Sequence, residues 1–279
     1  MTENKLSLAS KLLYSTMKID ICNNNSGWSG TGFLFEFQLS QTETTYFLIS
    51  NKHVLMPAEP SEMYLTFHMA NPDHTPNNQN LKVKCPVTPE FLVPHPDKNV
   101  DLCAFYLSPL VEHLFSQKRE IFIQTLNCSL IPKDWRAFDS IEEVTMIGYP
   151  NGLSDKKNNF PIVRRGITAT SVEQNYNGKN EFMIDMACFP GSSGSPIFIL
   201  NSGGYFDGKK GVLNIIGARL FLLGILYAGP TRTDRGTIEF KDIASIEIQT
   251  MMHLGNVIKS TEIITLKKEI EKIMNKKLY

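Results

Sequence analysis

The sequence predicts an all-β protein. Short runs of apolar and β-branched residues recur along the chain, and segments rich in Gly, Pro, Asn or charged residues separate them. Two of these runs, 63–68 and 81–84, alternate between apolar and polar residues, as strands with one buried face do. The other runs lie at 30–37, 46–50, 100–107, 144–149, 162–170, 181–187, 197–200 and 215–229.

The end of the chain departs from this pattern. Beyond Asp242, apolar residues recur at intervals of three and four, and charged residues stand between them. These apolar residues are Ile243, Ile246, Ile263, Leu266, Ile270, Ile273 and Met274. The spacing predicts a helical C-terminal segment, and the stretch after Ser260 either docks on the body or contacts a partner or a second copy.

Composition excludes several classes of protein. The chain has 279 residues, with 28 Lys and Arg against 28 Asp and Glu, so its formal charge is zero. Without a basic stripe, neither nucleic acid nor an anionic membrane is expected as a partner. The five cysteines are an odd number and form no C-x-x-C pair, which favours reduced thiols over a disulfide framework or a zinc site. The N-terminal stretch carries an acid and no segment approaches the ~18 apolar residues of a membrane span, so we expect a soluble, cytoplasmic protein.

Residues 189–196 have the composition of a reaction centre. They read F-P-G-S-S-G-S-P and precede the apolar run 197–200. Gly191 and Gly194 allow backbone torsions that a β-carbon would forbid, so the N–H groups of Gly191 and Ser193 could converge on one developing negative charge as an oxyanion hole. Taken alone, such a segment is more often a Ser/Gly turn between two strands.

A nucleophilic serine needs a base and a carboxylate that orients the base. His53 comes just after the strand predicted at 46–50, and Asp101 heads the apolar strand that runs to residue 107. A carboxylate in that position is costly unless it has a partner. The predicted catalytic residues are therefore Ser193 as nucleophile, His53 as base and Asp101 as the carboxylate that orients the base.

Three motifs in this order resemble those of the chymotrypsin/trypsin-like serine proteases. G-S-S-G-S-P at 191–196 is similar to the family's nucleophile motif, I-S-N-K-H-V at 49–54 to the bacterial form of its histidine motif, and D-L-C-A-F-Y-L at 101–107 to its aspartate strand. The likeness extends to bacterial trypsin-like peptidases, including the protease domain of high-temperature-requirement proteases and the glutamyl endopeptidases.

The resemblance implies a fold and a division of the chain. The expected fold is two six-stranded antiparallel β-barrels, chymotrypsin-like, with a C-terminal helix or helices. Residues 1–25 would be an N-terminal lead and first strand, and 26–135 a first barrel carrying His53 and Asp101. Residues 136–241 would be a second barrel carrying Ser193, and 242–279 a C-terminal helical segment.

The resemblance also implies an activity. The chain would be a serine endopeptidase that hydrolyses peptide bonds through an acyl-enzyme, without a cofactor or metal. Its substrate would be a protein or peptide, and the likeness to bacterial peptidases implies cleavage of one specific intracellular protein in a stress or defence setting. A regulatory protein would be a further partner. The alternatives are a catalytically latent or non-catalytic binding module on a protease fold, and an esterase with the same three residues.

The family pattern also locates a specificity pocket. Its floor would be Ala187, six residues before the nucleophile, and the residues around it would be Cys188, Leu226, Tyr227, Ala228 and Gly229. None of these is charged, so we expect a small or medium apolar residue before the scissile bond. A single insertion would instead bring Asp185 to the floor.

Three positions bear on regulation and support of the site. Ser192 stands where relatives activated by N-terminal cleavage carry Asp, so that kind of activation is not predicted. Tyr227 stands where many relatives have a serine that hydrogen-bonds the catalytic Asp, so that support is missing or made differently. Arg164 and Arg165 are either a solvated edge pair or a substrate or regulatory contact.

Overall fold

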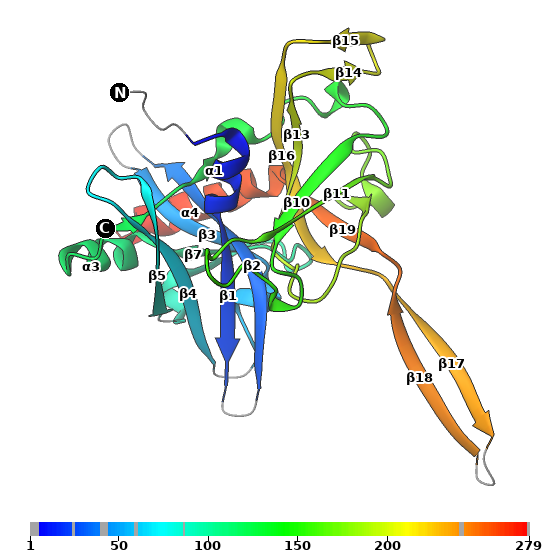
Figure 1. Cartoon of the computed structure of the whole chain (residues 1–279), viewed down its shortest axis with the longest axis horizontal. Coiled ribbons are helices and arrows are strands. Elements are labelled where there is room, and N and C mark those ends of the chain that lie inside the picture. Colours follow the sequence, from blue (N-terminus) through cyan, green and yellow to red (C-terminus); the bar gives the residue numbers. More distant parts are fainter. Residues whose placement is uncertain are drawn as a thin grey trace.

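In the computed structural model, residues 6–23, 26–39, 44–58, 61–85, 87–239 and 243–277 are described. The predicted runs become strands that form two large sheets side by side, and a long C-terminal helix lies across them (Figure 1). The predicted all-β, chymotrypsin-like fold with a C-terminal helix is confirmed.

The first sheet contains nine strands. The strands are β1 (Thr16–Cys22), β2 (Gly27–Gln38), β3 (Thr44–Ser50), β4 (Glu62–Ala70), β5 (Pro76–Cys85), β6 (Leu92–Pro94), β7 (Cys103–Tyr106), β8 (Ile121–Phe122) and β9 (Leu126–Asn127). The main path runs β5-β4-β1-β2-β3-β7-β6, with β8 on β4 and β9 parallel to β2. Among the described residues this path is open, where the resemblance implied a closed barrel of six strands.

The second sheet is a closed six-stranded barrel in the order β10-β11-β12-β19-β16-β13. Its strands are β10 (Glu143–Gly148), β11 (Ile162–Thr168), β12 (Glu181–Asp185), β13 (Pro196–Ser202), β16 (Ala218–Ala228) and β19 (Leu254–Lys259). Neighbouring strands are antiparallel throughout. The nucleophile loop lies between β12 and β13.

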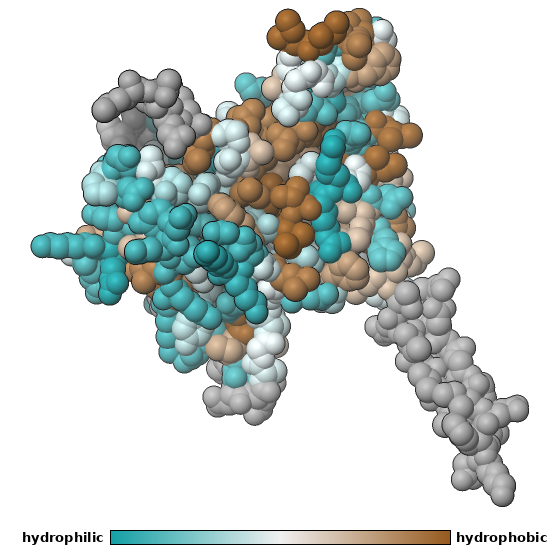
Figure 2. Space-filling model, in the orientation of Figure 1, coloured by the Kyte–Doolittle hydropathy of each residue, from teal (hydrophilic) through white to brown (hydrophobic). Residues whose placement is uncertain are grey.

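Two hairpins project from the second barrel (Figure 1). One pairs β14 (Tyr205–Asp207) with β15 (Val212–Asn214), and the other pairs β17 (Thr231–Glu239) with β18 (Ile243–Met251). The tip of the first hairpin is strongly hydrophobic on its surface (Figure 2), because Phe206, Leu213, Ile215 and Ile216 are exposed there.

The predicted helical segment at 242–279 is wrong up to Lys259. Residues 243–251 pair along their whole length with β17, and β19 closes the barrel between β12 and β16. The physical reason is that long-range strand pairing overrides a weak helical spacing. The second barrel therefore extends to residue 259, beyond the expected boundary at 241.

Four helices and five 3₁₀ turns complete the described fold. They are α1 (Leu8–Ser15), α2 (Lys52–Leu55), α3 (Ser108–Ser116) and the long α4 (Thr261–Lys277), with 3₁₀ turns η1 (Pro89–Phe91), η2 (Cys128–Leu130), η3 (Trp135–Ala137), η4 (Pro150–Gly152) and η5 (Tyr176–Gly178). The predicted spacing in α4 is real, since Ile263, Leu266 and Ile270 are buried against the body. The stretch after Ser260 thus docks on the body.

One hydrophobic cluster joins the two halves of the molecule. It combines side chains of the first sheet, the second barrel and α4, and its members include Phe33, Phe35, Ile49, Phe198, Leu222, Ile225 and Ile263. Close packing between the halves holds residues of β2, β3 and the nucleophile loop in one place.

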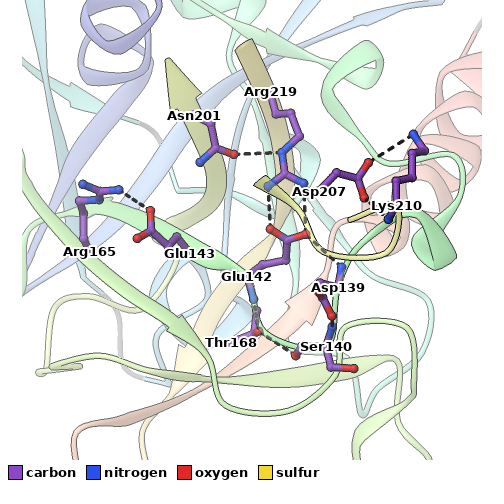
Figure 3. Close-up of polar contacts among 10 residues, drawn as sticks. All are labelled: Asp139, Ser140, Glu142, Glu143, Arg165, Thr168, Asn201, Asp207, Lys210 and Arg219. Atoms are coloured by element: carbon purple, nitrogen blue, oxygen red, sulfur yellow. Dashed lines mark hydrogen bonds and ion pairs between the residues drawn. The ribbon is translucent and has the colours of Figure 1, made fainter. Parts of the chain in front are cut away.

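An ion pair between the half-buried Arg219 of β16 and the buried Glu142 links β16 to the segment before β10 (Figure 3). Arg219 donates two hydrogen bonds to Glu142, at 2.7 and 3.1 Å, and a third to Asn201 at 3.0 Å. Its guanidinium lies 4.2 Å from the ring centre of Tyr205. Glu142 also accepts a hydrogen bond from the Asp139 N–H at 3.0 Å. Neither Arg219 nor Glu142 has a buried side-chain polar atom without a hydrogen-bond partner, as the burial of a charged pair requires.

Candidate active site

Strand pairing brings His53 and Asp101 together. Strand β3 ends at Ser50, which pairs with Cys103 at the start of the antiparallel strand β7. The residue after β3 and the residues before β7 therefore face each other. His53 Nδ1 lies 2.5 Å from Asp101 Oδ2, and the His53 backbone N–H donates to Asp101 Oδ1 at 3.1 Å. The side chain of Asn51 donates to the Asp101 carbonyl at 2.7 Å and secures the loop.

These contacts determine the charge of Asp101. Burial opposes its ionisation, but hydrogen bonds from the His53 side chain and from the backbone N–H groups of His53 and Lys52 outweigh burial and lower the pKa of the carboxyl. An ionised carboxylate only accepts hydrogen bonds, so His53 Nδ1 carries the proton. In the neutral imidazole this tautomer leaves Nε2 of His53 as the acceptor nitrogen.

The loop that carries Ser193 requires two glycines. Gly191 and Gly194 have φ angles of +84° and +87°. A β-carbon on Gly194 would collide with the carbonyl oxygen of Thr31. The loop is bound to β16, because the Gly194 N–H donates to the Leu226 carbonyl at 2.8 Å and the Leu226 N–H to the Ser195 carbonyl at 2.9 Å.

The carbonyl groups of this loop have partners. Pro190 O accepts from the Asn151 N–H at 2.6 Å, and Ser193 O accepts from the Thr31 N–H at 2.9 Å. Gly191 O accepts from the Thr31 hydroxyl at 2.9 Å. Within the described part of the chain, the N–H groups of Gly191 and Ser193 donate no hydrogen bond. Both predicted oxyanion donors are therefore available.

The Ser193 hydroxyl donates a long hydrogen bond of 3.4 Å to the Tyr227 carbonyl. No hydrogen bond links Ser193 to His53 among the described residues. The structure thus brings two of the three predicted catalytic residues, His53 and Asp101, into contact. Ser193 lies in a loop that is hydrogen-bonded to β16, and the Ser193 hydroxyl is directed at the Tyr227 carbonyl.

The Tyr227 side chain does not support Asp101. Its hydroxyl donates to Glu181 at 2.8 Å, and burial together with this carboxylate raises the Tyr227 pKa. The support that many relatives obtain from a serine comes here from the backbone N–H groups of Lys52 and His53. Ser192, which replaces the zymogen-type Asp, is fully buried.

The predicted specificity residues differ in burial. Cys188 and Leu226 are buried in the second barrel, and burial raises the pKa of the Cys188 thiol to about 11. Ala187 is half-buried, as are Tyr227, Ala228 and Gly229. Asp185, the alternative floor, is exposed.

Sequence reasoning missed one residue beside the proposed pocket, Gly255, and left the role of a second, Arg164, open. A β-carbon on Gly255 of β19 would lie 2.6 Å from both Cys188 Sγ and Leu226 Cδ1, so only glycine fits without displacement. Arg164 donates to the Ala187 carbonyl at 2.7 Å, and its guanidinium lies 4.9 Å from the ring centre of Phe189. Arg164 is therefore bound to the pocket backbone, whereas Arg165 forms an exposed pair with Glu143. The sequence does not indicate a role for Gly255, because the predicted helix over 242–279 includes the strand that carries it.

No described group of three or more His, Cys, Asp or Glu side chains could hold a metal ion. All five cysteines are free thiols. Among the described helices, none has both the length and the apolarity needed to cross a membrane.

The fold and this arrangement define a chymotrypsin-like serine protease. The trypsin-like peptidase domain family matches residues 30–205, and the chain belongs to that family. No curated protein sequence matches the chain significantly.

One solved structure supports the fold, and two others are similar at lower TM-scores. An HtrA-type protease, AlgW, with a tripeptide superposes with a TM-score of 0.50 at 15% identity, over 95% of this chain and 64% of that one. This chain thus spans less than two thirds of the AlgW chain. A thermostable serine protease from an extremophilic microorganism has a TM-score of 0.45 at 12% identity, covering 94% of this chain and 98% of that one. Catalytically active tobacco etch virus protease with its product has 0.46 at 11%, covering 96% and 84%.

Proposed function

We propose that this chain is a serine endopeptidase that acts through Ser193, His53 and Asp101. Ser193 Oγ attacks the peptide carbonyl carbon while His53 Nε2 takes the hydroxyl proton. His53 then gives that proton to the leaving amine, and the C–N bond breaks to leave an acyl ester on Ser193. Water repeats the sequence, with His53 as base, and releases the acid. Asp101 keeps the imidazole in the required tautomer and stabilises its cation.

The N–H groups of Gly191 and Ser193 would hold the oxyanion of each tetrahedral intermediate. Each such donor contributes roughly 3–4 kcal/mol in comparable sites. The observation that carries the proposal is the 2.5 Å contact of His53 with an ionised Asp101, next to a loop whose carbonyls have partners and whose two N–H groups have none.

The Ser193 hydroxyl must turn from the Tyr227 carbonyl toward His53 before attack. Catalytic hydrogen bonds in free enzymes are often formed only with substrate. The Ser193–Tyr227 contact also favours the second candidate, a catalytically latent protease that a regulatory protein partner would switch on.

The proposed substrate is a protein with a small or medium apolar residue before the scissile bond. The side chains of Ala187, Cys188 and Leu226 and the backbone of Gly255 form the proposed pocket without a carboxylate, and the one cation beside it, Arg164, is bound to the Ala187 carbonyl. By the family resemblance, an extended substrate would pair with the backbone at Gly229. We further propose cleavage of one dedicated protein in a bacterial stress or defence setting in the cytoplasm. Five free thiols and the resemblance to stand-alone bacterial peptidases support this setting.

A fluorophosphonate probe with intact-mass detection tests the nucleophile. We expect one adduct on the wild type, none on Ser193→Ala, and strongly slowed labelling of His53→Ala. Ser192→Ala is the matched control, since it removes the neighbouring buried hydroxyl and should label like the wild type.

Absence of labelling in both the purified protein and the host lysate would refute the proposal of an endopeptidase. Labelling in lysate alone would establish the latent form. An esterase is separated by comparing hydrolysis of a peptide substrate with hydrolysis of the corresponding ester.

A further inference from the structure

A groove of about 680 Å³ lies beside the nucleophile loop, on the side of the first sheet. Its walls come from β1, β2, β4 and β5 and from the loop of η4, and it reaches Pro190 and Gly191. Trp28 lines it with 38% of its surface exposed.

The groove contains none of the residues that enclose the proposed acyl pocket. A substrate whose carbonyl oxygen lies on the N–H groups of Gly191 and Ser193 places its acyl half against Ala187 and β16. Its other half, which carries the leaving amine, continues past Gly191 on the opposite side. That path leads into the groove, because Gly191, whose N–H group is one of the two proposed oxyanion donors, also lines the groove.

The charges in the groove are unbalanced. Three ammonium groups line it, those of Lys18, Lys82 and Lys156, and the only carboxylate among its described lining residues is that of Asp20. Asp20 binds Lys18 at 2.8 Å and Lys82 at 3.3 Å, so one carboxylate is shared between two cations. The groove keeps an excess positive charge that a substrate carboxylate could neutralise.

Lys18 is held close to the reaction centre. A β-carbon on Gly152 would lie 3.5 Å from Lys18 Nζ, so the ammonium packs against that residue. The preceding residue, Asn151, holds the Pro190 carbonyl. Lys82 also lies 5.0 Å from the ring centre of Tyr64, which restricts its side chain. Two of the three lysines are thus placed by contacts within the groove.

We propose that this groove binds the leaving-group side of the substrate and selects acidic residues just after the scissile bond, through Lys18, Lys82 and Lys156. The inference rests on the proposed endopeptidase function. It names the substrate class as a protein segment with a small apolar residue followed by acidic residues.

Peptide binding to the full-length Ser193→Ala protein tests the groove without turnover. The probes are two N-acetylated, C-amidated decapeptides with the same alanine-rich first half and either Glu or Lys at three positions of the second half. Trp28 fluorescence reports binding, and the signal that disappears in Ser193→Ala/Trp28→Phe is the signal from the groove. We expect the Glu peptide to bind about tenfold more tightly than the Lys peptide, and the difference to shrink as salt rises from about 0.05 to about 0.5 M.

Lys18→Gln/Lys82→Gln, added to Ser193→Ala, should remove most of that preference. Lys118→Gln/Lys179→Gln removes two exposed lysines elsewhere and should leave it unchanged. Equal affinity for the two peptides, no detectable binding of either at about 1 mM, or a preference that survives Lys18→Gln/Lys82→Gln would overturn the inference.

Fluorophosphonate labelling keeps the two proposals apart. If the wild type is labelled but the protein does not prefer the Glu peptide, the endopeptidase proposal is retained and the proposed role of the groove is refuted. Acidic selectivity without any labelling of Ser193 leaves the groove as a peptide site and refutes the endopeptidase.

Discussion

The hydroxyl of Thr31 in the first sheet donates a 2.9 Å hydrogen bond to the carbonyl of Gly191 in the nucleophile loop of the second barrel. The same hydroxyl accepts the N–H of Tyr149 at 3.0 Å, and Thr31 is completely buried. One side chain of β2 therefore orients the peptide group that follows Gly191 and links β10 to the loop. The N–H groups of Gly191 and Ser193, which are proposed as oxyanion donors, flank that peptide group, so a contact from the first half of the molecule holds the loop that carries them.

Thr31→Val should slow labelling of Ser193 by about tenfold to a hundredfold, less than the 10²–10³ lost with an oxyanion donor itself. Valine keeps the shape but leaves the Tyr149 N–H and the Gly191 carbonyl without partners, which should also cost about 1–3 kcal/mol of unfolding free energy. Labelling rates and urea denaturation measure the two effects. Thr31→Ser retains the hydroxyl and should restore most of the rate, so equal loss in both variants would contradict this role.

Acid should destabilise the protein through His68. This side chain is buried against Tyr14 and Phe160, and burial lowers its pKa from the ordinary 6.5 to about 4. The folded state therefore binds the proton more weakly than the unfolded state. Above pH 6.5 His68 is neutral in both the folded and the unfolded state, so it does not affect the free energy of unfolding. As the pH drops from 6.5 toward 4, the unfolded state gains a proton first, and the free energy of unfolding falls by about 3 kcal/mol in total.

Denaturation of the wild type and His68→Phe at several pH values measures this effect. Phenylalanine keeps the ring contacts and cannot titrate, so the wild type should lose about 3 kcal/mol more than His68→Phe between neutral pH and pH 4. The exposed His113→Gln serves as control and should follow the wild type. Parallel curves for wild type and His68→Phe would show that His68 is not the titrating group.

Arg219→Met should destabilise the fold by about 3–5 kcal/mol, because it leaves Glu142 buried without a counter-charge. The side chains of Arg219 and Glu142 are only 14% and 7% exposed. Arg219→Met combined with Glu142→Gln should recover much of the loss. Chemical denaturation provides the measurement.

The matched control for this pair is Arg165→Met, which breaks the exposed Arg165–Glu143 pair on the neighbouring strand. Exposed pairs contribute about 0–1 kcal/mol, so this variant should unfold near the wild-type midpoint. Similar losses for Arg219→Met and Arg165→Met would mean that burial does not determine the energy of the Arg219 pair.

Gly255→Ala should narrow the pocket next to Cys188 and Leu226. The added methyl group meets Cys188 Sγ and Leu226 Cδ1 at 2.6 Å, and such overpacking costs about 1–3 kcal/mol of stability. In p-nitrophenyl esters of acylated amino acids, kcat/KM should fall more for valine than for glycine. Cys188→Ala removes one of the two collisions and should partly restore valine esters. An equal fall for both esters would place Gly255 outside the specificity pocket.

Local patterns in the sequence determined much of this protein. Alternation at 63–68 and apolar runs such as 46–50 predict strands because side chains along a strand alternate between faces, and the spacing of Ile263, Leu266 and Ile270 predicts α4 because three and four residues make a turn. The motifs around His53, Asp101 and Ser193 indicated the family, and their catalytic roles remain predictions.

Contacts between distant segments were decided only by the tertiary structure. Residues 243–259 form strands since β17, β12 and β16 offer them partners, which no local spacing reveals. Other contacts also join segments remote in sequence. Tyr227 donates a hydrogen bond to Glu181, and Gly255 packs against Cys188 and Leu226. Asp20 forms ion pairs with both Lys18 and Lys82. Pairing and packing energies depend on which surfaces meet, so local patterns predicted most of the elements, whereas the folded chain determined their partners and the strand conformation of 243–259.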